Sequence, residues 1–132
     1  MRVSLDIETG LYGVLENNGY SASAHSIPAS LGETLPHVHV TRTGGYTTDI
    51  VIENNNIDFD VYAEDEAAAM TAASNLCGFV RDLVGTSIGD SPCYSVDVIT
   101  LPYSNPDPRH PNISRATFKT QILTRVKGAF YA

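Results

Sequence analysis

The sequence predicts an α+β fold in which a mostly antiparallel sheet of about four strands carries an N-terminal helix and one long central helix on one face. Residues 57–63 alternate apolar and polar side chains, as expected for a strand with one buried face. Residues 69–84 then carry apolar side chains at spacings of three and four, which is typical of an amphipathic helix. Pairs of strands separated by a helix favour helices packed on one face of a sheet.

An N-terminal helix is expected over residues 4–17, because apolar side chains recur there at helical spacing. Ser4 or Asp6 is suited to cap its start. Gly10 and Gly13 each cost up to ~1 kcal/mol relative to alanine inside a helix. This helix therefore needs tertiary packing to hold it.

The first clear strand is expected at residues 37–42, with Val38 and Val40 inward. Residues 20–35 lack a sustained period and are expected to form a connection, with a possible short strand near residues 25–27. Residues 44–55 begin with two glycines and run into three asparagines, which are turn residues. We therefore expect a long projecting hairpin loop at this point in the chain.

Two further strands are expected after the central helix. Residues 86–92 form a turn rich in glycine, serine and proline, and residues 94–100 alternate as a third strand. Residues 101–112 hold four prolines and cannot form a central strand, because proline lacks the backbone donor. Residues 113–127 alternate again and form the fourth strand.

Length and composition indicate a single globular domain over residues 1–132, with 42 % hydrophobic and 17 % charged residues. The net charge of −7 argues against binding nucleic acid by neutralising phosphates. No apolar run is long enough to span a bilayer, and the N-terminus has no signal-peptide pattern. Cys77 and Cys93 are expected to be buried, reduced thiols of a cytosolic protein.

Two histidines and two aspartates are the main candidates for chemistry. His37 and His39 share one face of the first expected strand, and Asp58 and Asp60 lie on a neighbouring strand. Alternate strand positions suit metal ligands, but zinc needs a larger ligand set than this pair of histidines supplies. Carboxylates on an exposed strand face also lack the environments that would separate their pKa values. We expect solvated polar side chains here, with no metal, cofactor or catalytic residue.

Four segments carry a resemblance to a known protein family, and they keep the order of elements found in that family. Residues 35–45 combine a proline, alternating valines, a basic residue and two glycines, and residues 57–63 form an acidic strand that enters an alanine-rich helix. Residues 106–115 lead into a long alternating strand, and residues 6–15 look like an opening helix. Together these segments resemble the bacteriophage tail terminator proteins.

The resemblance implies a structural role without enzymatic activity. Proteins of this family form a ring, usually a homohexamer, on the head-proximal end of the tail tube. They stop tube polymerisation and join the tail to the head-neck (stopper) complex. The implied partners are further copies of the chain, the tail tube protein and a neck protein. The resemblance implies that the protein is located in the virion, after assembly in the host cytoplasm. DNA would pass through the lumen without specific binding, as suits an acidic protein.

Two long segments, residues 46–56 and 102–111, are expected to be assembly surfaces rather than active-site lids. The first carries Tyr46, Ile50 and Ile52, which are suited to anchor a neighbouring subunit. The alternative is that Ile50 and Ile52 extend the second strand into the core. The candidate subunit and partner interface consists of Arg42, Tyr46, Asp49, Ile50, Ile52, Asp107, Arg109 and Arg115.

Other functions remain open at the level of sequence. A head-completion or neck protein would share the ring architecture. A small metal-binding hydrolase would use His37, His39 and Asp60. A ferredoxin-like ligand-binding module would use a sheet face as its pocket. Measurement of size in solution separates these classes, since a ring protein acts only as a closed oligomer.

Overall fold

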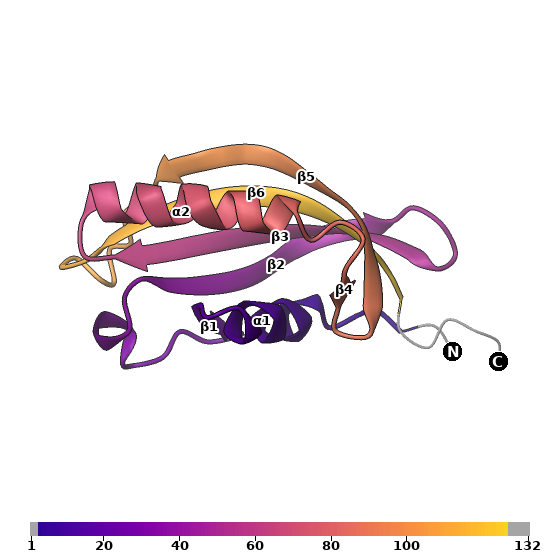
Figure 1. The fold of residues 1–132 in the computed structure, drawn as a ribbon, viewed down its shortest axis with the longest axis horizontal. Helices are drawn as coiled ribbons and strands as arrows, with labels where there is room; N and C mark the ends of the chain where they lie inside the picture. The colour runs from indigo at the N-terminus through magenta and orange to yellow at the C-terminus, as the bar shows by residue number, and fades with distance from the viewer. Residues whose placement is uncertain (1–2, 127–132) are drawn as a thin grey trace.

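The computed structural model describes residues 3–126, in which a six-stranded sheet is packed against two helices (Figure 1). The elements in chain order are α1 (Ile7–Asn17), β1 (Ser21–Ala24), the 3₁₀ turn η1 (Leu31–Glu33), β2 (His37–Thr47), β3 (Ile52–Ala63), α2 (Glu66–Arg81), β4 (Ser87–Ile88), β5 (Ser91–Ser104) and β6 (Ser114–Arg125).

The sheet has the strand order β1-β2-β3-β6-β5-β4 and curls into a half-barrel (Figure 1). β1 pairs with β2 in parallel, and the other neighbouring strands are antiparallel. α1 packs against β1, β2 and β4, whereas α2 packs against β3, β5 and β6. Side chains from both helices join one hydrophobic core, so the two helices share the same face of the sheet.

The predicted fold class is therefore wrong. The sheet is mixed, has six strands instead of about four, and dominates the fold, so that no single central helix organises it. The sequence places a short strand near residues 25–27 instead of at β1 and misses β4 altogether. β1 alternates only serine and alanine, which carry no large apolar side chain, and β4 has only two residues. Both strands form at the ends of the sheet order by pairing with a longer neighbour.

The predicted loop over residues 44–55 is also wrong, because β2 and β3 continue through most of it as a projecting β-hairpin (Figure 1). The pairing shifts register between Arg42 and Gly44, which form a bulge. Gly45 has φ +142°, and a Cβ there would overlap the carbonyl oxygen of Asn54. The glycine pair thus permits close pairing of the two strands instead of ending β2.

β5 is longer than the predicted third strand, whereas β6 confirms the predicted fourth strand. β5 continues past the predicted end at residue 100 to Ser104, and it includes Pro102. This proline is tolerated because β5 pairs with β6 on one side and with β4 only at Ser91 and Pro92. β6 confirms the fourth strand over Ser114–Arg125, and Lys127, the last residue of that prediction, lies outside the described residues.

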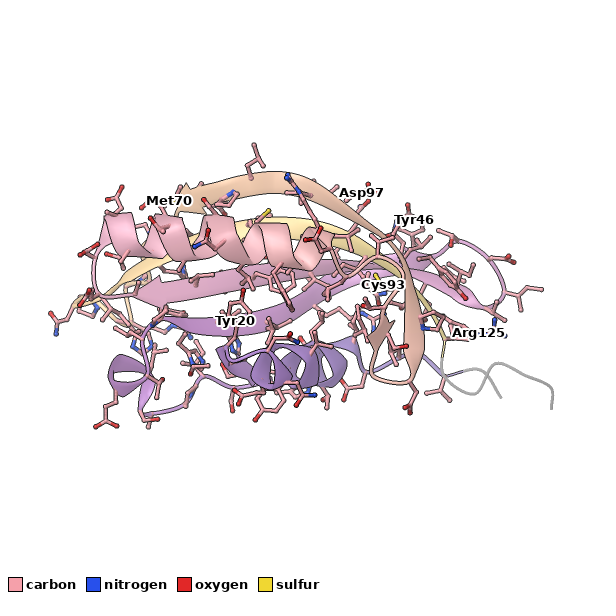
Figure 2. All side chains as sticks on the ribbon, viewed as in Figure 1. Tyr20, Tyr46, Met70, Cys93, Asp97 and Arg125 are labelled. Atoms are coloured by element: carbon pink, nitrogen blue, oxygen red, sulfur yellow. The ribbon has the colours of Figure 1, made fainter. Side chains whose placement is uncertain are left out.

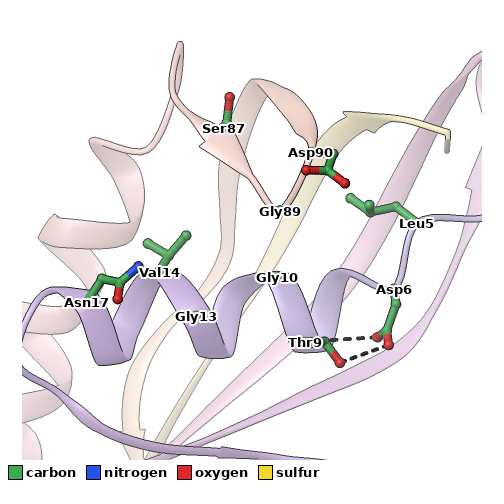
Figure 3. A pocket seen from close by; sticks show the side chains of 10 residues that line it. All are labelled: Leu5, Asp6, Thr9, Gly10, Gly13, Val14, Asn17, Ser87, Gly89 and Asp90. Carbon is green, nitrogen blue, oxygen red and sulfur yellow. Dashed lines mark hydrogen bonds between the residues drawn. The ribbon is translucent and has the colours of Figure 1, made fainter.

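α1 confirms the predicted first helix, with Asp6 as its N-cap. The Asp6 carboxylate accepts hydrogen bonds from the Thr9 backbone N–H and hydroxyl (Figure 3). Gly10 lies against β4, where an added Cβ would come within 2.9 Å of Ile88 Cγ2, so close packing supports this glycine-containing helix. Gly13 instead borders an open cavity of about 500 Å³ (Figure 3).

The centre of the core lies between α2 and the β3–β6 ladder. Phe59 and Phe118 face each other across the two strands, with ring centroids 4.9 Å apart. Leu76 of α2 is fully buried in the same cluster, which confirms the core face predicted for this helix. Cys77 and Cys93 are both buried and unbridged, as the sequence predicts.

Neither helix of the described chain is long and apolar enough to cross a lipid bilayer.

The core position of Leu76 predicts that Leu76→Ala lowers the free energy of unfolding by about 2–5 kcal/mol, through lost burial and the cavity left behind. Denaturant unfolding followed by circular dichroism measures this change. The matched control is Val84→Ala, at a position 48 % exposed, which should change stability by less than about 0.5 kcal/mol. Equal effects of the two substitutions would contradict the assignment of the core.

Candidate functional site

The predicted interface residues separate into groups at opposite ends of the β3–β6 ladder. Tyr46, Asp49 and Ile50 belong to the hairpin that joins β2 to β3. Arg115 pairs with the far end of β3, and Asp107 and Arg109 lie in the connection that precedes β6. The hairpin and this connection project at opposite ends of the long axis (Figure 1). The predicted interface residues therefore form two separate groups rather than one continuous surface.

The hairpin tip presents two large apolar side chains to solvent. Tyr46 is 57 % exposed and Ile50 is 64 % exposed, so Ile50 does not extend a strand into the core. The Tyr46 hydroxyl accepts a hydrogen bond of 3.0 Å from Asn54 Nδ2, and the Ile50 backbone N–H donates to Asp49 Oδ1. Ile52, at the start of β3, is half-buried. The tip thus exposes two apolar side chains, and the hydroxyl of Tyr46 is held within the hairpin (Figure 2).

Arg42 lies away from the tip, where β2 meets the start of α1. Its backbone N–H donates to Glu8 Oε2 at 2.6 Å, and its Nη1 donates to the carbonyl oxygen of Leu5 at 3.2 Å. Both contacts connect the N-terminal segment to the sheet, so within this chain Arg42 has a structural role.

Asp107 is the centre of a buried polar cluster at the other end of the sheet. Its side chain is only 2 % exposed, and its Oδ2 accepts a hydrogen bond of 2.9 Å from the Tyr62 hydroxyl. Arg115 Nη1 lies 3.5 Å from the same oxygen, and Arg109 Nε lies 3.3 Å from Oδ1. The Arg109 side chain is 72 % exposed, so it is the member of this cluster that is available to a partner.

The electrostatics of this cluster follow from burial and hydrogen bonding. Burial alone would raise the pKa of the Asp107 carboxyl, but hydrogen bonds from Arg109 and Tyr62 outweigh it and lower that pKa to about 2. Burial raises the pKa of the Tyr62 phenol to about 12, with a further contribution from Asp107. Asp107 therefore stays ionised and holds the connection before β6 against the sheet.

Sequence reasoning missed a second exposed apolar surface, along β5 at its free edge. β4 pairs only with Ser91 and Pro92, and within the described part of the chain no strand pairs with β5 on that side beyond them. Exposed apolar side chains follow along β5; they are Tyr94, Ile99, Leu101 and Tyr103, with Leu101 64 % exposed. An open strand edge with apolar side chains is a site for association with another chain. The prolines of residues 101–112 concealed it, because they indicated an irregular segment.

A chain of hydrogen bonds joins β1 to β2 on the face opposite the core. His37 Nδ1 lies 2.8 Å from Ser21 Oγ, and its Nε2 lies 2.8 Å from Ser23 Oγ. Ser23 Oγ also lies 2.7 Å from His39 Nδ1. The outward direction of both histidines is as predicted, but the expectation of solvated side chains is wrong: only 2 % of His37 and 9 % of His39 is exposed.

The shared serine couples the tautomers of the two histidines. Ser23 has one hydroxyl proton, so it can donate to only one imidazole and must accept from the other. Burial lowers the pKa of both His37 and His39, so both rings favour the neutral form. Both nitrogens of His37 are used by serine hydroxyls, which gives a physical reason for the prediction that this pair binds no metal.

Asp58 and Asp60 each contact a different side chain of β6. Lys119 Nζ lies 3.0 Å from Asp58 Oδ2, and Thr117 Oγ1 donates to Asp60 Oδ1 at 2.6 Å. These contacts cross-link β3 and β6 on the polar face. Next to them lies a cavity of about 510 Å³, whose polar lining includes His25, His39, Thr41, Asp60, Arg109 and His110.

No protein-family model matches the chain, and no curated protein matches it significantly.

The buried histidines predict that stability falls as the pH is lowered below about 6.5, the ordinary histidine pKa of an unfolded chain. The pKa values of both histidines are lowered in the folded state. As the pH falls below about 6.5, the unfolded chain therefore binds more protons than the folded chain, and the free energy of unfolding decreases. Asp107 and Asp6 titrate below this range, since the pKa of each is lowered from an ordinary value of 3.8. Thermal unfolding between pH 7.5 and 5 measures the effect, and a His37→Gln/His39→Gln variant should show a smaller dependence. An unchanged pH dependence in this variant would contradict the prediction.

The buried carboxylate predicts that Asp107→Ala lowers the free energy of unfolding by about 3–5 kcal/mol, because it leaves the Arg115 charge and the Tyr62 hydroxyl without their partner. Asp107→Asn should cost less, since the amide retains an acceptor. The matched control is Asp49→Ala on the exposed hairpin tip, for which denaturant unfolding should show a change within about 0.5 kcal/mol. A comparable loss in the control would show that burial of Asp107 is not the cause.

Proposed function

We propose that this protein is a structural component of a bacteriophage tail, which assembles into a homohexameric ring and caps the head-proximal end of the tail tube. In this role it ends tube polymerisation and provides the surface to which the head-neck complex binds. The proposal combines the family resemblance of the sequence with one structural observation. Two different apolar surfaces, the hairpin tip and the free edge of β5, are exposed on the same chain.

The separation of these surfaces supports a ring. A two-fold dimer requires one self-complementary patch, whereas two unlike patches join copies head to tail. Such a head-to-tail contact closes into a ring when the rotation per copy divides a full turn. Ser104, where β5 ends, pairs with Ala116 near the end of the ladder opposite the hairpin. Tyr46 and Ile50 of one copy are therefore well placed to contact the Leu101 end of β5 in the next.

The chemistry of both surfaces suits a permanent contact. Tyr46 and Tyr103 are aromatic anchors of the kind that dominate interfaces, and Ile50, Ile99 and Leu101 surround them with aliphatic area. The β5 edge also offers backbone donors and acceptors to a chain that pairs with it. The net charge of −7 suits a ring through which DNA moves without binding.

Solution size provides the first test of this proposal. Light scattering after size-exclusion chromatography should give a closed oligomer of about six copies, as expected for a cyclic ring. Tyr46→Ser/Ile50→Ser and Ile99→Ser/Leu101→Ser should each yield folded monomers, because truncated interface anchors cost about 2 kcal/mol or more each. A wild-type chain that stays monomeric at high concentration would refute the ring.

A matched control separates loss of assembly from general loss of an aromatic residue. Tyr12 lies on α1, away from both surfaces, and is 40 % exposed, so Tyr12→Ser should assemble normally. Electron microscopy of tails then tests the biological role. A ring at the head-proximal tube end supports the tail terminator, whereas a ring that binds only the head portal supports the alternative neck protein.

A further inference from the structure

Three potential metal ligands meet beside the start of α1, away from both ring surfaces. They are Asp6, Glu8 and His25, and one ligand atom from each lies within 4.8 Å of the other two. We propose that these side chains bind one Zn²⁺ ion, which fastens the segment after β1 to the first turn of α1. This proposal is independent of the ring, because it concerns a different part of the surface.

The distances within the triplet fit a shared cation. Glu8 Oε1 lies 3.0 Å from His25 Nδ1, and Asp6 Oδ1 lies 3.8 Å from His25 Nε2. Zinc ligands at about 2.0–2.2 Å from the metal lie roughly 3–3.5 Å from one another in a tetrahedral shell. Small movements of exposed side chains bring one ring nitrogen and both carboxylates to such positions, since the side chains of Asp6 and His25 are 64 % and 59 % exposed.

Both carboxylates are already oriented by hydrogen bonds within the chain, and Asp6 Oδ1, which faces His25, also accepts from the Thr9 backbone N–H at 3.3 Å. Glu8 Oε2 accepts from the Arg42 backbone N–H at 2.6 Å, which leaves Oε1 directed to His25. Asp6 Oδ2 accepts from the Thr9 hydroxyl at 2.8 Å (Figure 3). Metal-binding carboxylates are typically fixed by such outer contacts, which reduce the entropy lost on binding.

The electrostatic balance favours a cation in spite of the helix start. The N-terminus of a helix carries an effective charge of about +0.5, which disfavours metal binding. Asp6 and Glu8 together supply two negative charges directly beside it, so attraction exceeds this repulsion. A site with one imidazole nitrogen and two carboxylates suits Zn²⁺, whereas Mg²⁺ and Ca²⁺ prefer oxygen ligands alone.

A cavity of about 510 Å³ adjoins His25, which is one of the residues that line it. Three protein ligands leave a coordination position for water, and the cavity provides room for that water beside His25.

The experiment is a titration of the purified full-length chain with ZnCl₂ by isothermal calorimetry, with CoCl₂ as a spectroscopic probe. We expect one Zn²⁺ per chain and visible absorption bands of tetrahedral Co²⁺. Glu8→Gln retains an acceptor for Arg42 but removes the charge, and it should weaken zinc binding at least about tenfold. MgCl₂ should produce no comparable binding.

His25 and His110 line the same cavity, so a substitution at His25 tests the site and a substitution at His110 is its matched control. His25 has φ +69°, so His25→Gly removes the ligand while suiting the backbone, and it should abolish the site. His110→Ala changes a cavity histidine outside the triplet and should bind zinc within about twofold of wild type. Circular dichroism verifies that each variant is folded. Absence of zinc binding by wild type, or equal affinity in folded His25→Gly, would overturn the proposal.

Discussion

The pairing of β3 with β6 is the constraint on which the rest of the structure depends. All 12 residues of β3 pair with β6, and the ladder is cross-linked on both of its faces. On the core face Phe59 stacks on Phe118, and on the polar face Thr117 donates to Asp60. Since neither face can slip by one residue without burying charge and exposing aromatic rings, the register is fixed. That register sets the positions of everything attached to the ends of the two strands.

The surfaces that we propose for assembly are positioned by this ladder. At one end the β2–β3 hairpin projects and exposes Tyr46 and Ile50; at the other, the buried Asp107 fastens the connection between β5 and β6. β5 runs alongside β6 for most of the ladder, and its other edge remains available for a further chain. The proposed head-to-tail assembly depends on the ladder, because it sets the orientation of the hairpin relative to β5 and hence the rotation from copy to copy.

On the polar face, several titratable groups contact side chains of neighbouring strands. The Ser23 hydroxyl connects His37 with His39, and Asp58 and Asp60 of β3 contact side chains of β6. These contacts link neighbouring strands of the sheet. The polar groups that remain available, such as those of Asp6 and His25, lie where segments outside the ladder meet. Their positions depend on chain connections rather than on strand register.

The sequence by itself determined the elements that bury a periodic face. α1 with its Asp6 cap, α2, and the central parts of β2, β3, β5 and β6 could be predicted, because alternation or helical spacing of apolar residues is a local property. Only the tertiary structure decided the six-stranded mixed sheet, since β1 and β4 have no such pattern and form by pairing. The asparagine-rich segment is also a strand only in the tertiary structure. There β3 pairs with β2 on one side and β6 on the other, and this pairing outweighs the turn preference of residues such as Asn55. Of the candidate sites, the apolar hairpin residues could be predicted from the sequence. The exposed edge of β5 and the contact between Glu8 and His25 could not. Both arise from contacts between distant segments, which one-dimensional spacing does not encode.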